Sequence, residues 1–275
     1  RLSPPNNDRL VRGDTFVKQV GGAELNVAVG VALLGLRTGV ISKLPSHDMG
    51  SFMKGKIRSY GVSDDFFMYD DSPSARVGIY YYENGAYPRK PKVIYDRANS
   101  SFYSLKIDEI PEKAYTASRC FHTSGITLAL SPKVRETTIE MIKRFKAAGT
   151  LVSFDVNFRG NLWTGEEAKE CIEQILPYVD IFFCSEDTAR LTFKKTGTAR
   201  EMMKSFTEEY PISIVASTQR IVHSPKSHTF GSIIYDARKE DAMQLSAGHG
   251  AGCMGITLWA ENILRWRRRC CWHSV

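Results

Sequence analysis

The sequence lacks long hydrophobic runs. No apolar stretch approaches the ~18 to 20 residues that a membrane span requires, and residues 1–20 are polar, without a signal-peptide core. We therefore expect a soluble, cytoplasmic protein with no membrane partner. Internal repeats and low-complexity linkers are also missing. At 275 residues and 43% hydrophobic content the chain can bury a large core, which favours one main domain with a small appendage.

The sequence also lacks the cysteine and histidine spacings of a metal site. Its six cysteines are scattered, with no Cys-x-x-Cys pair and no histidine at a ligand spacing. We expect reduced thiols and no metal held directly by protein ligands.

Basic residues are not concentrated in one domain. The net charge of +7 is compatible with nucleic-acid binding, but lysines and arginines are interleaved with acids along the chain. The one dense run, Arg265–Arg269, lies beside Cys270, Cys271 and Trp272. Arginines next to aromatic residues can bind phosphates. We interpret this run as a tail without an evolved role and expect no nucleic-acid partner.

Helical and strand patterns alternate over most of the chain. Ser131 with Pro132 predicts a helix start, and Thr164 with Glu167 predicts a capping box. Repeated βα units predict a parallel sheet covered by helices on both faces. The expected helices cover residues 24–34, 132–148, 164–175 and 199–209, and the expected strands cover residues 38–44, 150–154, 180–184 and 212–216.

One region departs from this alternation. Residues 76–82 and 93–95 are short and rich in β-formers, and Asn84-Gly85 and Pro88 between them are turn signals. We expect a hairpin that projects from the sheet edge and serves as a lid.

Polar side chains follow the apolar strand that ends at Phe154. Ligands of open parallel sheets bind beyond the carboxyl ends of the strands, where Asp155, Asn157 and Arg159 fall. In the alternative interpretation, Asp155 and Asn157 only cap the next turn and Arg159 pairs on the surface. We favour a ligand contact for Arg159, between a buried strand and Trp163, and leave Asn157 open.

The expected lid offers a second arginine. Arg97 and Tyr95 are two residues apart and share one face of an extended chain. Two arginines that face one pocket can hold a carboxylate by charge-assisted hydrogen bonds, which selects a sugar acid over a neutral sugar. Tyr80 and Tyr82 also share a face, and packing within the lid is the expected role of at least one of them.

A Gly-Gly pair precedes the first expected helix. Gly21 and Gly22 let the backbone approach a ligand closely, and amides at a helix start favour negatively charged oxygens. A lone Gly-Gly also fits an ordinary turn. Followed by Glu24 and Asn26, the pair becomes a more specific sign of a binding site.

Together these motifs resemble those of the ribokinase-like (PfkB) family of sugar kinases, and within it the 2-keto-3-deoxygluconate kinases. The resemblance implies an α/β fold with a doubly wound, mostly parallel sheet flanked by helices and a small β-lid. It spans about residues 1–238 and implies a kinase domain over residues 1–240, with the lid formed by residues 8–20 and 76–105. The motifs are GGAELN (21–26), GIY (78–80), YDR (95–97) followed by Ser100, HTSGITLALS (122–131) and DVNFRGNLW (155–163).

The resemblance also implies a reaction. It indicates transfer of the γ-phosphate of ATP, with Mg²⁺, to the terminal hydroxyl of 2-keto-3-deoxygluconate. Another sugar kinase of this fold, such as a fructokinase, is the alternative. With Gly21 and Asn157 added from the analysis above, the expected substrate contacts are Gly21, Gly22, Asn26, Tyr80, Tyr95, Arg97, Asn157 and Arg159.

The chain departs from the family pattern in several places. The family's first strand, which ends in Gly-Glu, has no counterpart before Arg1, and Ser185, Glu186 and Asp187 stand where the family has Asn-x-x-Glu near the metal and phosphates. Glu186 or Asp187 is our candidate substitute. We expect a chain truncated at both ends, whose uncovered apolar faces favour a homo-oligomer through the lid or the sheet edge.

The largest departure lies near the C-terminus. Gly250, Ala251 and Gly252 match the family's Gly-Ala-Gly-Asp loop, whose amides form an anion hole, but Cys253 replaces the aspartate that takes the proton from the attacking hydroxyl. An ordinary thiol, with pKa ~8.5, is mostly protonated at neutral pH. We expect an atypical, frame-shifted or disordered segment over 241–275, and a non-catalytic remnant that binds sugar acid is the alternative to an active kinase.

Overall fold

The structure, a computed structural model, describes residues 1–85, 88–224 and 227–250. A six-stranded sheet in the order β12-β11-β10-β9-β8-β7 forms its centre. The four strands from β7 to β10 run parallel, as predicted, and β11 and β12 add an antiparallel edge. The strands are β7 (Cys120–Ser124), β8 (Leu151–Asp155), β9 (Ile181–Phe183), β10 (Ile214–Ser224), β11 (Ser227–Asp236) and β12 (Asp241–Gly250).

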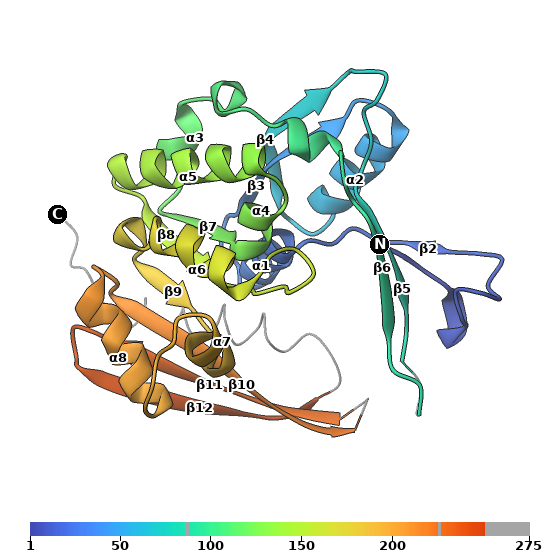
Figure 1. The fold of residues 1–275 in the computed structure, drawn as a ribbon. Coiled ribbons are helices and arrows are strands. Elements are labelled where there is room, and N and C mark those ends of the chain that lie inside the picture. Colours follow the sequence, from blue (N-terminus) through green and yellow to red (C-terminus); the bar gives the residue numbers. More distant parts are fainter. Residues whose placement is uncertain (86–87, 225–226, 251–275) are drawn as a thin grey trace.

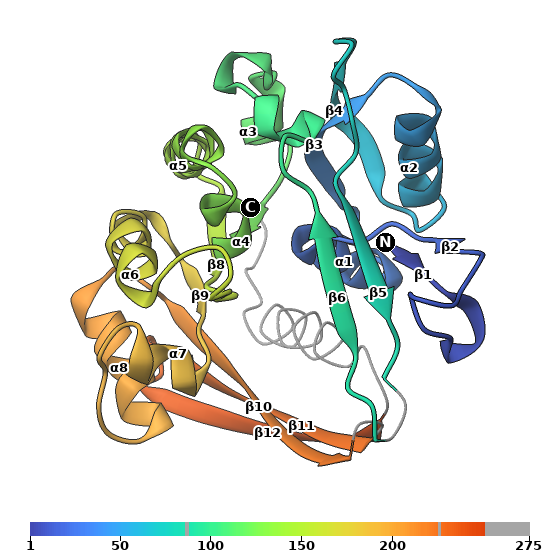
Figure 2. The ribbon, with the colours of Figure 1, turned by 45° about the vertical axis from the view of Figure 1, so that its right-hand side comes forward.

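Helices α5, α6 and α8 lie along one side of this sheet, and α1 lies on the other side, toward the lid (Figures 1 and 2). The two predicted helix starts are confirmed, because Ser131 accepts a hydrogen bond from the Val134 amide and Thr164 and Glu167 form a capping box. The helices of this part are α3 (Lys113–Thr116), α4 (Gly125–Ala129), α5 (Pro132–Ala147), α6 (Gly165–Glu173), α7 (Glu186–Leu191) and α8 (Ala199–Glu209), with short 3-10 turns η2 (Ser101–Ser104), η3 (Ile107–Glu109) and η4 (Leu176–Tyr178).

A smaller α/β unit precedes the large sheet. Its strands β3 (Gly39–Pro45) and β4 (Ser63–Asp70) pair in parallel and are joined by α2 (Asp48–Arg58). Helix α1 (Ala23–Leu33) packs on this pair. The sequence analysis anticipated α1 and β3 but missed α2 and β4. The unit has its own apolar core, separate from the large one, made of Leu25, Ala28, Leu44, Ile57, Val62 and Phe67.

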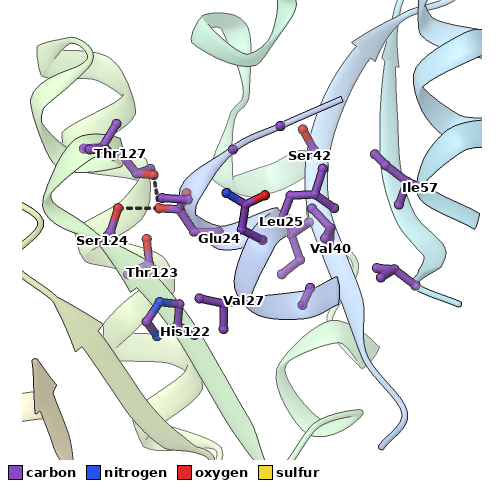
Figure 3. A pocket seen from close by; sticks show the side chains of 18 of the residues that line it. Glu24, Leu25, Val27, Val40, Ser42, Ile57, His122, Thr123, Ser124 and Thr127 are labelled. Atoms are coloured by element: carbon purple, nitrogen blue, oxygen red, sulfur yellow. Dashed lines mark hydrogen bonds between the residues drawn. The ribbon is translucent and has the colours of Figure 1, made fainter. Parts of the chain in front are cut away.

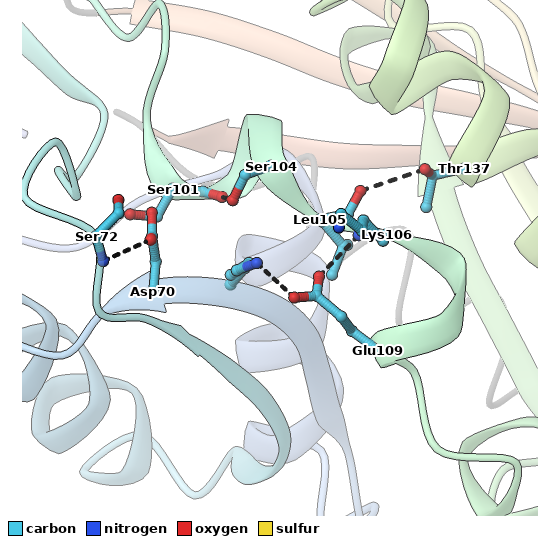
Figure 4. A network of polar contacts seen from close by, with 9 residues as sticks. Asp70, Ser72, Ser101, Ser104, Leu105, Lys106, Glu109 and Thr137 are labelled. Carbon is cyan, nitrogen blue, oxygen red and sulfur yellow. Dashed lines mark hydrogen bonds and ion pairs between the residues drawn. The ribbon is translucent and has the colours of Figure 1, made fainter.

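A polar network joins the small unit to the large one on the side of η3 (Figure 4). The buried Lys43 of β3 forms an ion pair with Glu109 at 2.5 Å, and the other oxygen of Glu109 accepts the amide of Lys106 at 2.8 Å. Thr137 of α5 donates to the carbonyl of Leu105 in the same segment at 3.3 Å. The two cores are thus connected by charged and polar contacts as well as by chain continuity.

The lid is a four-stranded sheet in the order β2-β1-β5-β6, and it stands beside the small unit (Figure 2). Its β5–β6 hairpin was predicted, and Tyr80 pairs directly with Tyr95 in it. The buried Glu83 accepts the amide of Leu10 and pairs with Arg89, so it ties the hairpin to the loop before β2. The strands are β1 (Leu2–Ser3), β2 (Val17–Lys18), β5 (Ile79–Glu83) and β6 (Lys92–Asp96), and the 3-10 turn η1 (Pro5–Asn7) follows β1.

The expected domain boundary at residue 240 falls in the turn between β11 and β12. Residues 241–250 of the segment that we expected to be atypical form β12, which pairs with β11 from Asp236↔Asp241 to His228↔Gly250. Residues 251–275 lie outside the described residues, and the expectation for them stays a prediction. Among the described helices, none combines the length and the apolar character that a membrane crossing requires.

Helix α2 provides a matched test of the packing. A Cβ atom at Gly50 would lie 1.8 Å from the Pro45 carbonyl oxygen, whereas a Cβ atom at Gly55, in the same helix, would meet nothing within 4 Å. We expect Gly50→Ala to lower the free energy of unfolding by ~1–3 kcal/mol or more, because the helix must move away from β3. Gly55→Ala should raise it by ~0.5–1 kcal/mol. Urea unfolding of both variants measures this, and equal effects would contradict the close approach.

Candidate active site

A large cavity extends from the lid and the start of α1 along the carboxyl ends of β7 and β8, and it continues along α1 to β3, α2 and the amino ends of β7 and β8. Its volume is about 2230 Å³. This exceeds the ~300–1,000 Å³ of a usual small-molecule pocket, so a ligand site occupies only part of it. All of the expected substrate contacts line it, namely Gly21, Gly22, Asn26, Tyr80, Tyr95, Arg97, Asn157 and Arg159.

The Gly-Gly turn and the lid meet at Tyr80. A Cβ atom at Gly21 would lie 2.6 Å from the Tyr80 hydroxyl oxygen, so a larger residue there would displace the end of the Tyr80 side chain. Tyr80 and Tyr95 face each other across the hairpin with ring centroids 6.0 Å apart. Burial raises the pKa of Tyr80, which keeps its hydroxyl neutral and able to donate a hydrogen bond. Tyr82 lines the same cavity, as its shared face with Tyr80 predicts.

Arg97 is available to a ligand. Its guanidinium carbon lies 4.3 Å from the centroid of the Tyr95 ring, which orients the side chain. The neighbouring Asp96 is occupied by Arg76, which binds it at 2.8 Å. Among the described residues, no hydrogen-bond or ion-pair partner is found for the Arg97 guanidinium. Its donors are therefore free to bind an anion in the cavity.

The segment after β8 combines turn capping with cavity lining. Asp155 accepts the amide of Asn157 at 2.9 Å, and Asn157 has a positive φ of 38°, so the turn-capping interpretation holds for Asp155. Arg159 is exposed, and its Nη1 donates to the Phe158 carbonyl at 3.1 Å. The arginine that lies over Trp163 is Arg135, whose guanidinium carbon is 5.8 Å from the centroid of the ring. The side chain of Arg159 thus keeps donors for a ligand, but Trp163 does not hold it.

Burial shifts the pKa values of several groups in the cavity wall: it raises those of Cys120 and Cys184, and it also acts on Asp155 and His122. Burial raises the pKa of Asp155 from 3.8 to about 6, and the negative charge of Glu24 adds to this increase. The hydrogen bond from the Asn157 backbone amide and the positive charge of Arg159 act in the opposite direction. Burial lowers the pKa of His122 to about 4, against the smaller effect of Glu24. His122 is therefore neutral at physiological pH, and its Nδ1 lies 2.9 Å from the Ser153 hydroxyl.

Glu24 links the helix start to the end of β7 (Figure 3). Its Oε1 accepts hydrogen bonds from Ser124 Oγ and Thr127 Oγ1, each at 2.7 Å. The sequence analysis noted Glu24 only as part of a motif and gave no role to Ser124 or Thr127. These partners are 100 and 103 residues away along the chain, so no local pattern could have connected them.

The expected phosphate and metal region lies at the end of β9. Ser185 lines the cavity and caps α7 by accepting the Thr188 amide. Glu186 pairs with Arg190 at 2.9 Å, and Asp187 is exposed; neither is among the cavity residues. In the part of the chain that the structure describes, no group of three or more His, Cys, Asp or Glu side chains could hold a metal ion. The role of Glu186 and Asp187 stays a prediction.

The expected catalytic loop lies almost entirely outside the described residues. Gly250 is the last residue of β12. The other three residues of the loop, Ala251, Gly252 and Cys253, lie outside the described residues. Cys120, Cys171 and Cys184 carry free thiols, and the latter two are buried.

Comparison with known proteins identifies the family. Residues 2–219 match the pfkB family of carbohydrate kinases, which is well over half of the chain. The chain belongs to this family. Its fold is accordingly the ribokinase-like α/β fold with a β-lid, as the motifs predicted.

Individual pfkB relatives agree with this assignment. The chain is 35% identical to a 2-dehydro-3-deoxygalactonokinase of Haloferax volcanii over 219 residues, 80% of this chain and 68% of the relative. It is 31% identical to a 2-dehydro-3-deoxygluconokinase of Bacillus subtilis over 172 residues, 62% of this chain and 52% of the relative. The matches thus span between about half and two thirds of these relatives' lengths. The crystal structure of a Thermotoga maritima 2-dehydro-3-deoxygluconokinase superimposes with a TM-score of 0.88 at 27% identity, covering 98% of this chain and 84% of that one.

The buried carboxyl of this pfkB site predicts a pH dependence. Because the pKa of Asp155 is raised to about 6, its ionised form destabilises the folded state, and stability is lost as the pH rises through that value. Asp155→Asn keeps an acceptor for the Asn157 amide and cannot ionise. We expect this variant to gain melting temperature relative to the parent at pH 8 but not at pH 4.5. The exposed Asp65→Asn serves as the control, and an equal gain at both pH values would contradict the assignment.

Proposed function

We propose that this pfkB chain binds 2-keto-3-deoxygluconate as the phosphate acceptor of an ATP-dependent kinase. The observation that carries this is the guanidinium of Arg97, which has no hydrogen-bond or ion-pair partner among the described residues and faces the same cavity as Arg159. Charge-assisted, bidentate hydrogen bonds from arginine suit a carboxylate. A neutral sugar would leave these donors unsatisfied, which argues against the fructokinase alternative.

The similarity to named relatives supports a 2-keto-3-deoxy sugar acid. The Bacillus subtilis and Thermotoga maritima relatives bear the name of the gluconate kinase, and the Haloferax volcanii relative bears that of the galactonate kinase. The two acids share the carboxylate and differ in the configuration at one hydroxyl-bearing carbon. The galactonate is therefore our second candidate, and contacts to that hydroxyl, rather than the arginines, would decide between them.

The same cavity has room for the nucleotide. Ser185 and Thr188 line it at the end of β9, where we place the phosphates of ATP. Magnesium that is bound mainly through nucleotide phosphates needs only one or two protein carboxylates, and Asp187, which is exposed beside the cavity residues Ser185 and Thr188 in sequence, is our candidate for one of them. When bound, the ion would neutralise charge on the transferred phosphate.

The sugar hydroxyl that attacks the γ-phosphate needs a group that takes its proton. Phosphoryl transfer requires the terminal hydroxyl to lie in line with the γ-phosphate and to lose its proton. The family resemblance assigns that step to position 253, where this chain has cysteine. We propose that sugar binding is intact and that transfer is slow, so the chain lies between an active kinase and a non-catalytic sugar-acid-binding remnant.

We also propose a cytoplasmic location, where ATP is available, and a homo-oligomer formed through the lid. The outer strand of the hairpin exposes apolar side chains, with Val93 38%, Ile94 44% and Tyr95 46% accessible. Apolar groups on an edge strand favour pairing with another chain.

The carboxylate hypothesis predicts a selective loss of affinity. Arg97→Gln removes the charge but leaves the hairpin pairing in place. We expect it to weaken binding of 2-keto-3-deoxygluconate by about 10- to 100-fold, since a hydrogen bond to a charged group contributes ~1.5–3 kcal/mol. Arg200→Gln, at an exposed arginine that pairs with Asp241 and is absent from the cavity wall, should change nothing. Isothermal titration calorimetry measures both, and parental binding of fructose as tight as that of the keto-acid would refute the hypothesis.

The replacement at position 253 predicts slow turnover. We expect ADP formation with saturating keto-acid and MgATP to fall well below the ~1–100 s⁻¹ of ordinary kinases. A coupled ADP assay checks this, with enzyme lacking the keto-acid as the control for background hydrolysis. Turnover in the ordinary range would show that Cys253 does not limit the chemistry.

A further inference from the structure

Glu24 is an acidic side chain in the wall of a cavity that we expect to bind an anion. It belongs to the first turn of α1, directly after the Gly21-Gly22 turn, and its side chain extends toward the end of β7 (Figure 3). A carboxylate at this place repels an anionic ligand and contributes nothing to its binding by charge. Its presence therefore requires another explanation.

The contacts of Glu24 supply one. Its Oε1 receives two short hydrogen bonds, from the hydroxyls of Ser124 and Thr127, both at 2.7 Å. Ser124 ends β7 and is fully buried, and Thr127 lies in the first turns of α4 and is 9% exposed. Hydrogen bonds from hydroxyls to a carboxylate are stronger than those between neutral groups, and here they are largely removed from water.

These bonds cross the junction between the two apolar cores. Leu25 and Ala28 of α1 pack in the core of the small unit, whereas Leu128 and Ala129 of α4 pack in the large core. Apolar contacts also cross this junction, because Ile41 of β3 and Phe66 and Met68 of β4 pack against the large core, but apolar burial is non-directional. On the η3 side the ion pair of Lys43 with Glu109 crosses the junction, and on the cavity side Glu24 does.

The start of α1 carries part of the proposed sugar site. The backbone N–H of Asn26 donates to the Gly22 carbonyl at 2.9 Å, which closes the first turn of the helix. Gly21 lies next to the Tyr80 hydroxyl. The other part, Asn157 and Arg159, follows β8, which is paired with β7 through Ser124↔Asp155. A tie between Glu24 and Ser124 therefore sets the distance between the two halves of the site.

We propose that Glu24 is a positioning residue, which holds the Gly21-Gly22 turn and the first turn of α1 in register with the carboxyl ends of β7 and β8. It acts through Ser124 and Thr127 and does not itself bind the sugar. The functional consequence rests on the proposed function, because it assumes that both halves contact one sugar acid.

The chain offers variants that separate geometry from charge. Glu24→Gln keeps an oxygen acceptor for both hydroxyls, and Glu24→Ala removes it. The pair Ser124→Ala with Thr127→Val removes the donors from the opposite side. Glu109→Ala breaks the ion pair with Lys43 across the junction, leaves the buried Lys43 without this partner, and alters no cavity residue. It is the control for general loosening.

Hydrogen exchange provides a readout that needs no ligand. We expect Glu24→Ala, and equally the double variant at Ser124 and Thr127, to raise exchange at the first hydrogen-bonded amides of α1, residues 26–29, by at least tenfold relative to the parent. Glu24→Gln should stay within about threefold, and combining Glu24→Ala with the double variant should add little, because one interaction has been removed twice. Glu109→Ala should lower the melting temperature without changing exchange at residues 26–29.

Calorimetric titration with 2-keto-3-deoxygluconate then tests the functional consequence. Affinity should fall about tenfold or more in Glu24→Ala and in the double variant, and should be kept in Glu24→Gln and Glu109→Ala. The proposal is overturned if Glu24→Ala leaves exchange unchanged, or if Glu109→Ala has the same effects. Parental protein that binds no keto-acid, with exchange as expected, would remove the proposed substrate and leave the positioning role supported. Should Glu24→Ala not fold, the double variant and Glu24→Gln decide.

Discussion

The junction between two apolar cores is the constraint on which this site depends. The small unit and the large sheet each bury their own apolar side chains, and the cavity opens where they meet. Apolar burial also crosses the junction, where Ile41, Phe66 and Met68 of the small unit pack against the large core, but it is non-directional. Hydrogen bonds and ion pairs across the junction, such as those of Glu24 and Lys43, add directional contacts that help to set the orientation of the two units. A binding site placed there can have residues from both units at a defined separation.

Charge is distributed unevenly around the cavity. Arg97, on the segment after the lid hairpin, and Arg159, in the turn after β8, carry positive charge. Glu24 and Asp155 lie in the inner wall, where the negative charge of Glu24 helps to raise the pKa of Asp155. An elongated acid with one carboxylate and several hydroxyls has a matching asymmetry. Its carboxylate is attracted to the arginines and repelled by the inner wall. The same fields would therefore orient such a ligand as well as bind it.

The sequence predicted those features whose signals are local. Strand β8 and helix α5 were anticipated because a short apolar run and a Ser-Pro start are encoded within a few residues. Strand β4 was missed because its sequence, SDDFFMYD, opens with charged residues, and α2 because two glycines interrupt it. The antiparallel strands β11 and β12 contain few apolar residues at alternating positions, so their pairing depends on neighbours in the sheet. Cavity residues were found through motifs, but the stacking of Arg135 on Trp163 and the contacts of Glu24 arise only from the tertiary fold.

Recognition and chemistry draw on different parts of this chain. The residues proposed to recognise the sugar acid fall between Gly21 and Arg159 and are held by α1, the lid and the end of β8. The residues proposed for the phosphates and for proton transfer begin at Ser185 and continue to position 253. Under the proposed function, a thiol in place of the carboxylate at 253 removes a proton acceptor, but it changes neither the guanidinium groups nor the Gly21–Tyr80 contact. Binding energy realised equally in the ground state and in the transition state does not accelerate a reaction. The proposed function therefore allows affinity for the sugar acid to be retained where the rate of phosphate transfer is small.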